Sequence, residues 1–219
     1  MRTFYIKRDY YDPGRYIFRK AHIAVKPGLT VLIGCNGRGK TTFLEHVKQV
    51  LEKESITTVS FNNVRDGGSN SISRAGFYGD IEFMAKALCS SEGERIRLNI
   101  ERIASMCGTT VRKLKKDPKA KQELWVLLDA VDSGFSIDNI LELKKDLFEP
   151  MIADCREKGI ELYILAAANE FEMARCEQCL DIQTGKYVSC NSYERYSSII
   201  MRTRRWKDKF LSQSSENHP

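Results

Sequence analysis

Apolar positions along the chain follow two spacings, short runs typical of buried strands and longer periods typical of helices. Apolar and β-branched runs predict five strands, at residues 17–25, 29–33, 56–61, 123–129 and 161–168. A Lys-Pro-Gly turn separates the first two runs, and a hairpin is expected over 180–189, around Thr184-Gly185-Lys186.

Helical spacing of apolar residues predicts the remaining regular structure, at residues 43–54, about 80–89, a helix through Ile96, Ile100 and Ile103, about 137–158, and about 192–210. Pro150 is expected to kink or split the fourth of these helices. Residues 65–71 read as a polar loop, and residues 112–121 as a basic loop or short hairpin tip.

Strands alternate with helices, and the strands are continuously apolar. This pattern favours an α/β fold with a mainly parallel sheet covered by helices. We expect a single domain over residues 1–211, followed by a disordered tail at 212–219.

Composition changes this picture little. The 219 residues are 42% hydrophobic and 29% charged, which is ordinary for a soluble domain. No apolar run is long enough to span a bilayer and residues 1–10 lack the pattern of a secretory signal, so a cytoplasmic location is expected. The net charge of +6 is compatible with nucleic acid and with an anionic nucleotide.

A glycine-rich turn follows the second predicted strand and carries the main chemical signal. Gly34, Gly39, Lys40 and Thr41 fit the phosphate-loop spacing G-x-x-x-x-G-K-[ST]. Glycines let successive N–H groups point at phosphate oxygens, and the following helix adds its positive N-terminus. Lys40 would reach the β- and γ-phosphates, and the Thr41 hydroxyl would hold Mg²⁺. The predicted nucleotide-binding residues of this loop are Gly34, Asn36, Gly37, Arg38, Gly39, Lys40, Thr41 and Thr42.

Asp129 ends a buried strand, where a doubly wound sheet presents its ligands. We therefore expect it to complete the Mg²⁺ site opposite Thr41, although a turn carboxylate is the simpler alternative. An aromatic of the cluster Tyr10, Tyr11 and Tyr16, with Tyr11 as the candidate, could stack on the nucleotide base or pack at the rim.

The order of motifs resembles the ABC-type ATPase family. Between the phosphate loop and Asp129 the family carries a signature of the form L-S-G-G-E/Q; here Ser91, Gly93 and Glu94 match, while Ser90 and Glu92 depart from it. Residues 128–134 look like the corresponding stretch of SMC-like and RecF-like members, and the resemblance covers roughly residues 17–169. It implies a P-loop NTPase fold with an antiparallel N-terminal portion and a reduced helical subdomain around residues 70–122.

The resemblance also implies ATP and Mg²⁺ as cofactors and a homodimer that sandwiches ATP. Ser91 and Gly93 of one chain would cap the ATP held by Lys40 of the other, with a further protein partner reading the change. Nucleic acid is an additional candidate partner through the basic stretches 112–121 and 202–209.

Departures from the family pattern concern hydrolysis. Ala130 stands where the family has a glutamate that polarises the attacking water, so Asp132 is the nearest candidate substitute, with a capping role as the alternative. Asn169 takes the place of the switch histidine, and asparagine cannot shuttle a proton. No glutamine lies between Lys53 and Lys121 for a family-type Q-loop, which leaves Asn62, Asn63 and Asp80 as candidates.

The sequence thus predicts an ATP-binding, slowly hydrolysing ABC-type ATPase with catalytic candidates Lys40, Asp129, Asp132 and Asn169, in DNA repair or defence. A non-hydrolysing ATP-dependent switch or scaffold is the alternative that Ala130 favours. The ATP-binding subunit of a membrane transporter is disfavoured by the short segment before the signature.

Overall fold

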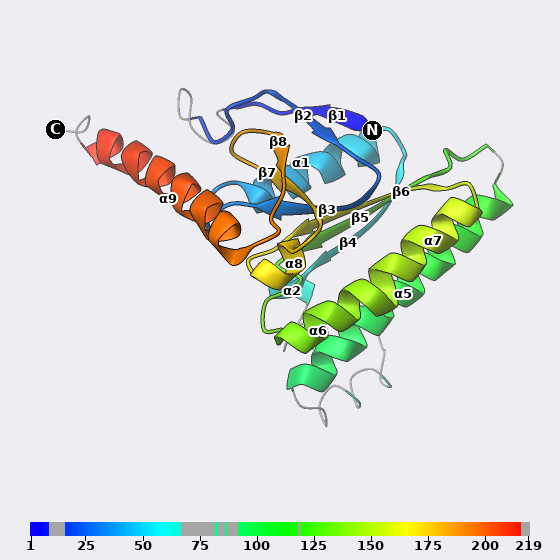
Figure 1. Ribbon diagram of the computed structural model, residues 1–219. Coiled ribbons are helices and arrows are strands. Elements are labelled where there is room, and N and C mark those ends of the chain that lie inside the picture. Colours follow the sequence, from blue (N-terminus) through cyan, green and yellow to red (C-terminus); the bar gives the residue numbers. More distant parts are fainter. Residues whose placement is uncertain (9–15, 67–81, 83–85, 87–91, 118, 216–219) are drawn as a thin grey trace.

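The computed structural model describes residues 1–8, 16–66, 82, 86, 92–117 and 119–215 (Figure 1). Its centre is a six-stranded sheet of order β4-β5-β6-β3-β7-β8. These strands are β3 (Gly28–Ile33), β4 (Thr57–Asn62), β5 (Glu123–Asp129), β6 (Glu161–Ala167), β7 (Gln178–Asp181) and β8 (Lys186–Val188). All neighbours pair in parallel except β7 and β8, which form the predicted antiparallel hairpin. The mainly parallel sheet is therefore confirmed.

Strand β5 shows why the central strands are apolar throughout. Leu124, Val126 and Leu128 pack into a core on one face of the sheet, whereas Trp125 and Leu127 pack into a second core on the other face. Successive side chains of a strand point to opposite faces, so a sheet covered on both sides needs an uninterrupted apolar run.

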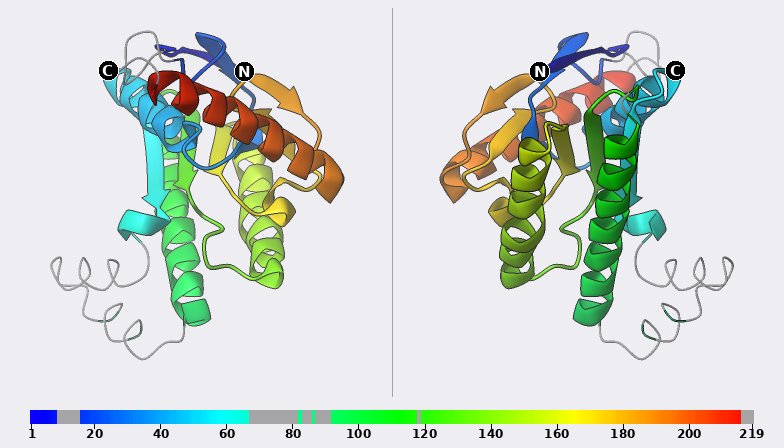
Figure 2. Two further views of the ribbon diagram at one scale, coloured as in Figure 1. Left: turned by 90° about the vertical axis from the view of Figure 1, so that its left-hand side faces the viewer. Right: turned by 90° about the vertical axis from the view of Figure 1, so that its right-hand side faces the viewer.

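Helices cover the two faces unequally (Figures 1 and 2). One face carries α1 (Lys40–Lys53) together with a small antiparallel sheet of β1 (Arg2–Tyr5) and β2 (His22–Val25). The other face carries α5 (Glu92–Lys116), which lies beside a continuous helical segment. That segment comprises α6 (Ile137–Glu142), the π-helix η1 (Leu143–Phe148) and α7 (Glu149–Glu157).

The long helix α9 (Tyr193–Ser215) begins near the β7–β8 hairpin and crosses the end of the sheet where β6 and β3 finish (Figure 2). The short helices α2 (Asn63–Asp66) and α8 (Phe171–Ala174) follow β4 and β6. None of the described helices combines the length and the apolar character that crossing a bilayer requires.

The antiparallel N-terminal portion is present, but its strands differ from the expected ones. Strand β1 was not predicted, since a strand of four residues, with two polar residues before Phe4, shows no recognisable apolar pattern. The two strands around the Lys-Pro-Gly turn belong to different sheets, because β2 pairs with β1 while β3 pairs with β6 and β7. Only the long-range partner decides which sheet a short strand joins.

Other boundaries also shift. The basic stretch at 112–121 is not a hairpin tip, because α5 continues through Lys116. Pro150 lies in the first turn of α7, directly after η1, and the backbone remains helical across it, so the helix is not split there. The irregularity is the π-helical segment that precedes Pro150. Helix α9 reaches Ser215, four residues into the expected tail. The predicted helix at 80–89 lies almost entirely outside the described residues, as does most of the loop at 65–71.

Strand β1 anchors one core through Phe4, which is fully buried. Its ring meets Trp125 edge-on at 5.3 Å and Phe43 at 6.4 Å between ring centres. Phe4→Ala should lower the free energy of unfolding by about 3–5 kcal/mol, because it opens a cavity between sheet and helix. The exposed neighbour Thr3→Ala should change it by about 0.5 kcal/mol or less in the same urea titration. Equal effects of the two substitutions would contradict this role of β1.

Candidate functional site

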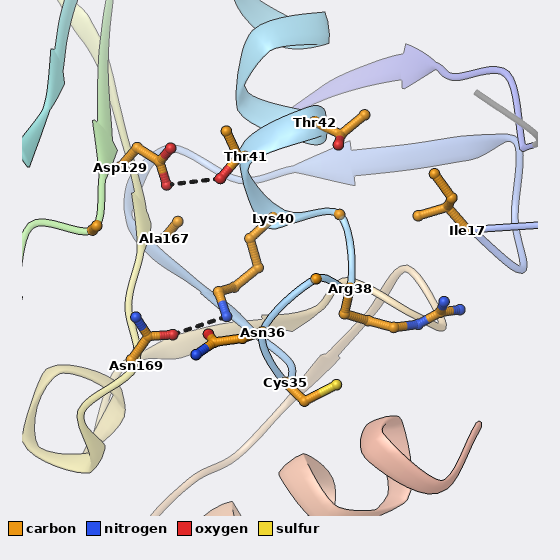
Figure 3. A pocket seen from close by; sticks show the side chains of 13 residues that line it. Ile17, Cys35, Asn36, Arg38, Lys40, Thr41, Thr42, Asp129, Ala167 and Asn169 are labelled. Carbon is orange, nitrogen blue, oxygen red and sulfur yellow. Dashed lines mark hydrogen bonds between the residues drawn. The ribbon is translucent and has the colours of Figure 1, made fainter. Parts of the chain in front are cut away.

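The site residues lie at the carboxyl ends of three parallel strands. The phosphate loop follows β3, Asp129 ends β5 and Asn169 follows β6 (Figure 3). Asp129 is paired with Ala167 of β6, and Leu32 of β3 is paired with the same residue. The side chains around these strand ends line a cavity of about 340 Å³, which is large enough for a small-molecule ligand.

Two glycines are required by the close packing of the loop. Gly39 has φ +92°, and a Cβ there would lie 2.6 Å from Cγ2 of Ile17. Gly37 has φ +74°, and a Cβ there would lie 2.8 Å from Nζ of Lys207. An L side chain would be strained at both positions, so these glycines allow the loop to curl and other segments to approach it.

Lys40 is a buried cation that lines the cavity. Its Nζ donates to the carbonyl of Gly34 at 2.6 Å and to Oδ1 of Asn169 at 3.0 Å (Figure 3). Burial lowers the pKa of this ammonium, while Asp132 and Asp129 partly offset the shift. Lys40 also begins α1, so a ligand beside it meets the positive end of that helix. Together these features favour an anion.

Thr41 and Asp129 supply two oxygens of the kind that Mg²⁺ prefers. The Thr41 hydroxyl donates to Oδ1 of Asp129 at 3.2 Å, and Asn62 Nδ2 donates to Oδ2 at 2.9 Å. An octahedral Mg²⁺ has ligands at about 2.1 Å, which places neighbouring ligand oxygens about 3 Å apart. The Thr41–Asp129 pair fits that spacing, and Asn62 fixes the orientation of the carboxylate.

Asp132 lies behind the cavity and does not line it. Its Oδ2 accepts the N–H groups of Asn169 and Glu170, both at 2.6 Å, whereas Oδ1 is buried without a hydrogen-bond partner among the described residues. Burial raises the pKa of this carboxyl group, and the two backbone N–H groups partly oppose that shift. Its observed contacts therefore fix the backbone on which Asn169 sits.

Ala130 lines the cavity directly after Asp129 and has φ +52°, which is unusual for a residue with a Cβ. Its N–H donates to the carbonyl of Ala167 at 3.1 Å, which holds the turn at the end of β5. The methyl side chain offers no proton acceptor, as the sequence indicated.

Most residues predicted from the phosphate loop line the cavity; they are Asn36, Gly37, Arg38, Gly39, Lys40, Thr41 and Thr42, and Asp129, Ala130 and Asn169 join them. Gly34 contributes its carbonyl to Lys40. Gly93 lies in the first turn of α5. Ser91, Tyr11 and Asp80 lie outside the described residues. Of the remaining Q-loop candidates, Asn62 contacts Asp129, while Asn63 donates to the carbonyl of Ser133.

The cavity has an aliphatic lining residue that sequence reasoning missed. Ile17 lines the cavity, whereas the neighbouring aromatic Tyr16 is exposed and has the Arg8 guanidinium 4.3 Å from its ring centre. A single isoleucine in a loop carries no recognisable signal, so only the folded chain could identify it.

Helix α9 supports the loop from outside, a role that the sequence did not suggest. Thr203 is fully buried and its hydroxyl accepts the N–H of Cys35 at 2.9 Å. Lys207 Nζ donates to the carbonyl of Asn36 at 3.0 Å, and the Tyr196 hydroxyl donates to the carbonyl of Asn169 at 2.6 Å. Tyr196, Thr203 and Lys207 are separated by seven and then four residues, so they lie on one face of α9.

The basic residues at the end of α9 are largely occupied by such internal contacts. Arg202 pairs with Asp181, Arg204 pairs with Asp208, and Lys207 bonds to the loop. The cations of α5 from Arg112 to Lys116 are exposed. They lie at the end of α5 shortly before β5 begins, whereas the cavity residue Asp129 lies where β5 ends. These contacts weaken the case for nucleic acid at residues 202–209.

Thr203→Val should lower the free energy of unfolding by about 1–3 kcal/mol, because it leaves the buried N–H of Cys35 without an acceptor at nearly unchanged volume. Ser198→Ala on the exposed side of α9 is the matched control and should cost about 0.5 kcal/mol or less. Thermal and urea unfolding measure both. If both variants unfold like the wild type, α9 does not brace the loop.

Comparison with known proteins agrees with this site. A search of curated proteins found no match. The sequence pattern of the AAA domain family matches residues 15–199, which include the phosphate loop, Asp129 and Asn169. Since the match extends over most of the 219 residues and the sheet has the corresponding architecture, the chain belongs to the AAA domain family of P-loop ATPases.

Proposed function

We propose that this domain binds ATP with Mg²⁺ in the cavity at the end of β3, β5 and β6, and that it hydrolyses ATP slowly. The observation that carries the proposal is the convergence of Lys40, Thr41 and Asp129. Lys40 and Thr41 come from the loop, and Asp129 comes from a strand that the parallel sheet places beside it. A buried ammonium next to a hydroxyl–carboxylate pair suits a triphosphate and its metal ion.

Each side chain has a definable task in this proposal. When the ligand binds, Lys40 exchanges its hydrogen bond to the amide oxygen of Asn169 for bonds to phosphate oxygens. The phosphate then supplies a negative charge next to the buried ammonium. Thr41 and Asp129 hold the Mg²⁺, which screens the phosphate charge when bound. Asn169, released from Lys40, can donate its amide N–H to the terminal phosphate.

Slow hydrolysis follows from the absence of a general base in the described lining. Ala130 occupies the position where the ABC-type pattern has a glutamate, and Asp132 is already bonded to two backbone N–H groups. We therefore assign Asp132 to positioning Asn169 and not to activating water. Without a base of suitable pKa, turnover loses about 10²–10⁴-fold.

The same proposal includes an ATP-dependent homodimer. The resemblance of residues 90–94 to the ABC-type signature would place Ser91 and Gly93 against the ATP of a second copy. The position of Gly93 in the first turn of α5 is compatible with an anion site at that helix terminus. On α6, Ile137 and Leu141 are exposed apolar side chains four residues apart, which suits a protein contact.

A protein partner would then read the dimerisation, in DNA repair or defence as the SMC-like and RecF-like resemblance suggests. The exposed cations near the end of α5 are better placed to contact a phosphate backbone than those of α9. The alternative function is an ATP-dependent switch without turnover, and Ala130 is the observation that favours it. The transporter reading has no supporting observation in this structure.

Lys40→Ala should weaken ATP binding about 100-fold, because it removes the charged donor for the phosphates. Asp129→Asn should abolish the gain in affinity that Mg²⁺ gives over EDTA. Calorimetric titration with and without Mg²⁺ measures both, and light scattering tests whether ATP produces dimers. Lys53→Ala, at the far end of α1, is the control and should match the wild type. Wild-type affinity in Lys40→Ala would refute the phosphate site.

Asp132→Asn separates the two roles of that residue. If Asp132 positions Asn169, the amide oxygen can still accept backbone N–H groups, and turnover should stay within about threefold of the wild type. Asp132→Ala should instead reduce stability by about 1–3 kcal/mol, because two N–H groups lose their acceptor. A fall in ATP turnover of about 100-fold in Asp132→Asn, at unchanged ATP affinity, would make Asp132 the general base.

A further inference from the structure

Arg38 is a charged residue of the phosphate loop whose Nε and Nη2 donors are not used within the described part of the chain. Only 4% of its surface is exposed, and both Nε and Nη2 are buried without a hydrogen-bond partner. Burial lowers the pKa of this guanidinium to about 10, so it stays charged at neutral pH. A buried cation without an acceptor is costly, which indicates that an acceptor arrives from elsewhere.

The nearby carboxylate does not meet this need. Asp181 lies close enough to influence Arg38, but its oxygens accept bonds from Arg202, Thr184 and the N–H of Gln183. These donors satisfy both oxygens of Asp181. The internal contacts therefore leave the unused edge of Arg38 for a group that the described residues do not supply.

Trp206 of α9 contacts the guanidinium from one side. The Arg38 Cζ lies 4.0 Å from the indole ring centre, and Arg19 lies 5.2 Å from the same ring. Such cation–π contacts orient a guanidinium but use none of its N–H donors. Nε–H and Nη2–H lie side by side on one edge, where they form a two-donor fork suited to a pair of acceptor atoms.

Arg38 is one of the residues that line the cavity, and its place there indicates which part of the ligand lies nearest to it. Lys40, Thr41 and Asp129 occupy the triphosphate end (Figure 3). Arg38 extends from the loop in the other direction, toward the side lined by Ile17. A nucleotide whose β- and γ-phosphates lie at Lys40 would place its nucleoside on the Ile17 and Arg38 side.

We propose that Arg38 is a specificity-determining residue whose Nε/Nη2 edge binds acceptor atoms of the nucleoside, with Trp206 as the residue that orients it. This inference rests on the proposed nucleotide binding. The acceptors are either the ribose hydroxyl oxygens or the N7 edge of a purine. Guanine offers two acceptors on that edge, O6 and N7, whereas adenine offers only N7.

The test compares ATP, 2′-deoxy-ATP, GTP and inorganic triphosphate, each with Mg²⁺, by calorimetric titration. Arg38→Met keeps an unbranched chain against Trp206 but removes the donors, and it should weaken ATP binding about 10- to 100-fold. Inorganic triphosphate should bind Arg38→Met within about threefold of the wild type, because it lacks a nucleoside. Arg38→Lys, which keeps the charge but loses the fork, should resemble Arg38→Met.

Three controls make the result specific. Arg205→Met removes an exposed cation from the same helix as Trp206 and should leave all four affinities unchanged. Trp206→Leu should weaken ATP more than triphosphate, although less than Arg38→Met does. Thermal unfolding of Arg38→Met should show no loss of stability, since the substitution removes unpaired buried donors.

The outcomes are separable. A wild type that binds GTP more tightly than ATP, with the preference lost in Arg38→Met, assigns the fork to the base. An Arg38→Met effect that disappears for 2′-deoxy-ATP assigns it to the ribose, and both results support the proposal. An equal loss for ATP and triphosphate, or no loss for any nucleotide, overturns it. If the wild type binds neither triphosphate nor nucleotide, the proposed function itself fails, and this inference fails with it.

Discussion

The parallel pairing of β3, β5 and β6 is the constraint on which the site depends. Parallel neighbours end at the same edge of a sheet, so the segments that follow them meet there. The phosphate loop, Asp129 and Asn169 are far apart in the chain and adjacent in space for this reason. The buried Lys40 ammonium then connects two of these segments, because it bonds to the Gly34 carbonyl and to the Asn169 amide.

Around this edge, the chain fixes each contact residue through a second one. Asn62 orients Asp129, Asp132 holds the backbone of Asn169, and Thr203 holds the loop at Cys35. Supporting hydrogen bonds of this kind limit the motion of groups that must meet a ligand at short distance. They also explain why α9, which ends the described chain, is packed so closely against a loop near its beginning.

The parts of the structure that have a local signal were predicted most accurately from the sequence. The phosphate loop has a fixed spelling, and the strand that ends at Asp129 is an unbroken apolar run, so both were predicted with their bounds nearly correct. The least accurate predictions concern β1 and the end of α5. A four-residue strand is specified by its partner, and a basic helical turn resembles a basic loop when only charge is considered.

The sequence by itself determined the class of fold and the place of the phosphate loop, because both follow from residue types at short, regular spacings. Only the tertiary structure decided that Asp132 turns toward the backbone of Asn169, that Ile17 lines the cavity, and that Trp206 stacks on Arg38. Those contacts join segments up to 168 residues apart, as Arg38 and Trp206 do. No local sequence pattern predicts contacts between such distant residues. They depend on the order of the strands in the sheet and on where α9 packs against them.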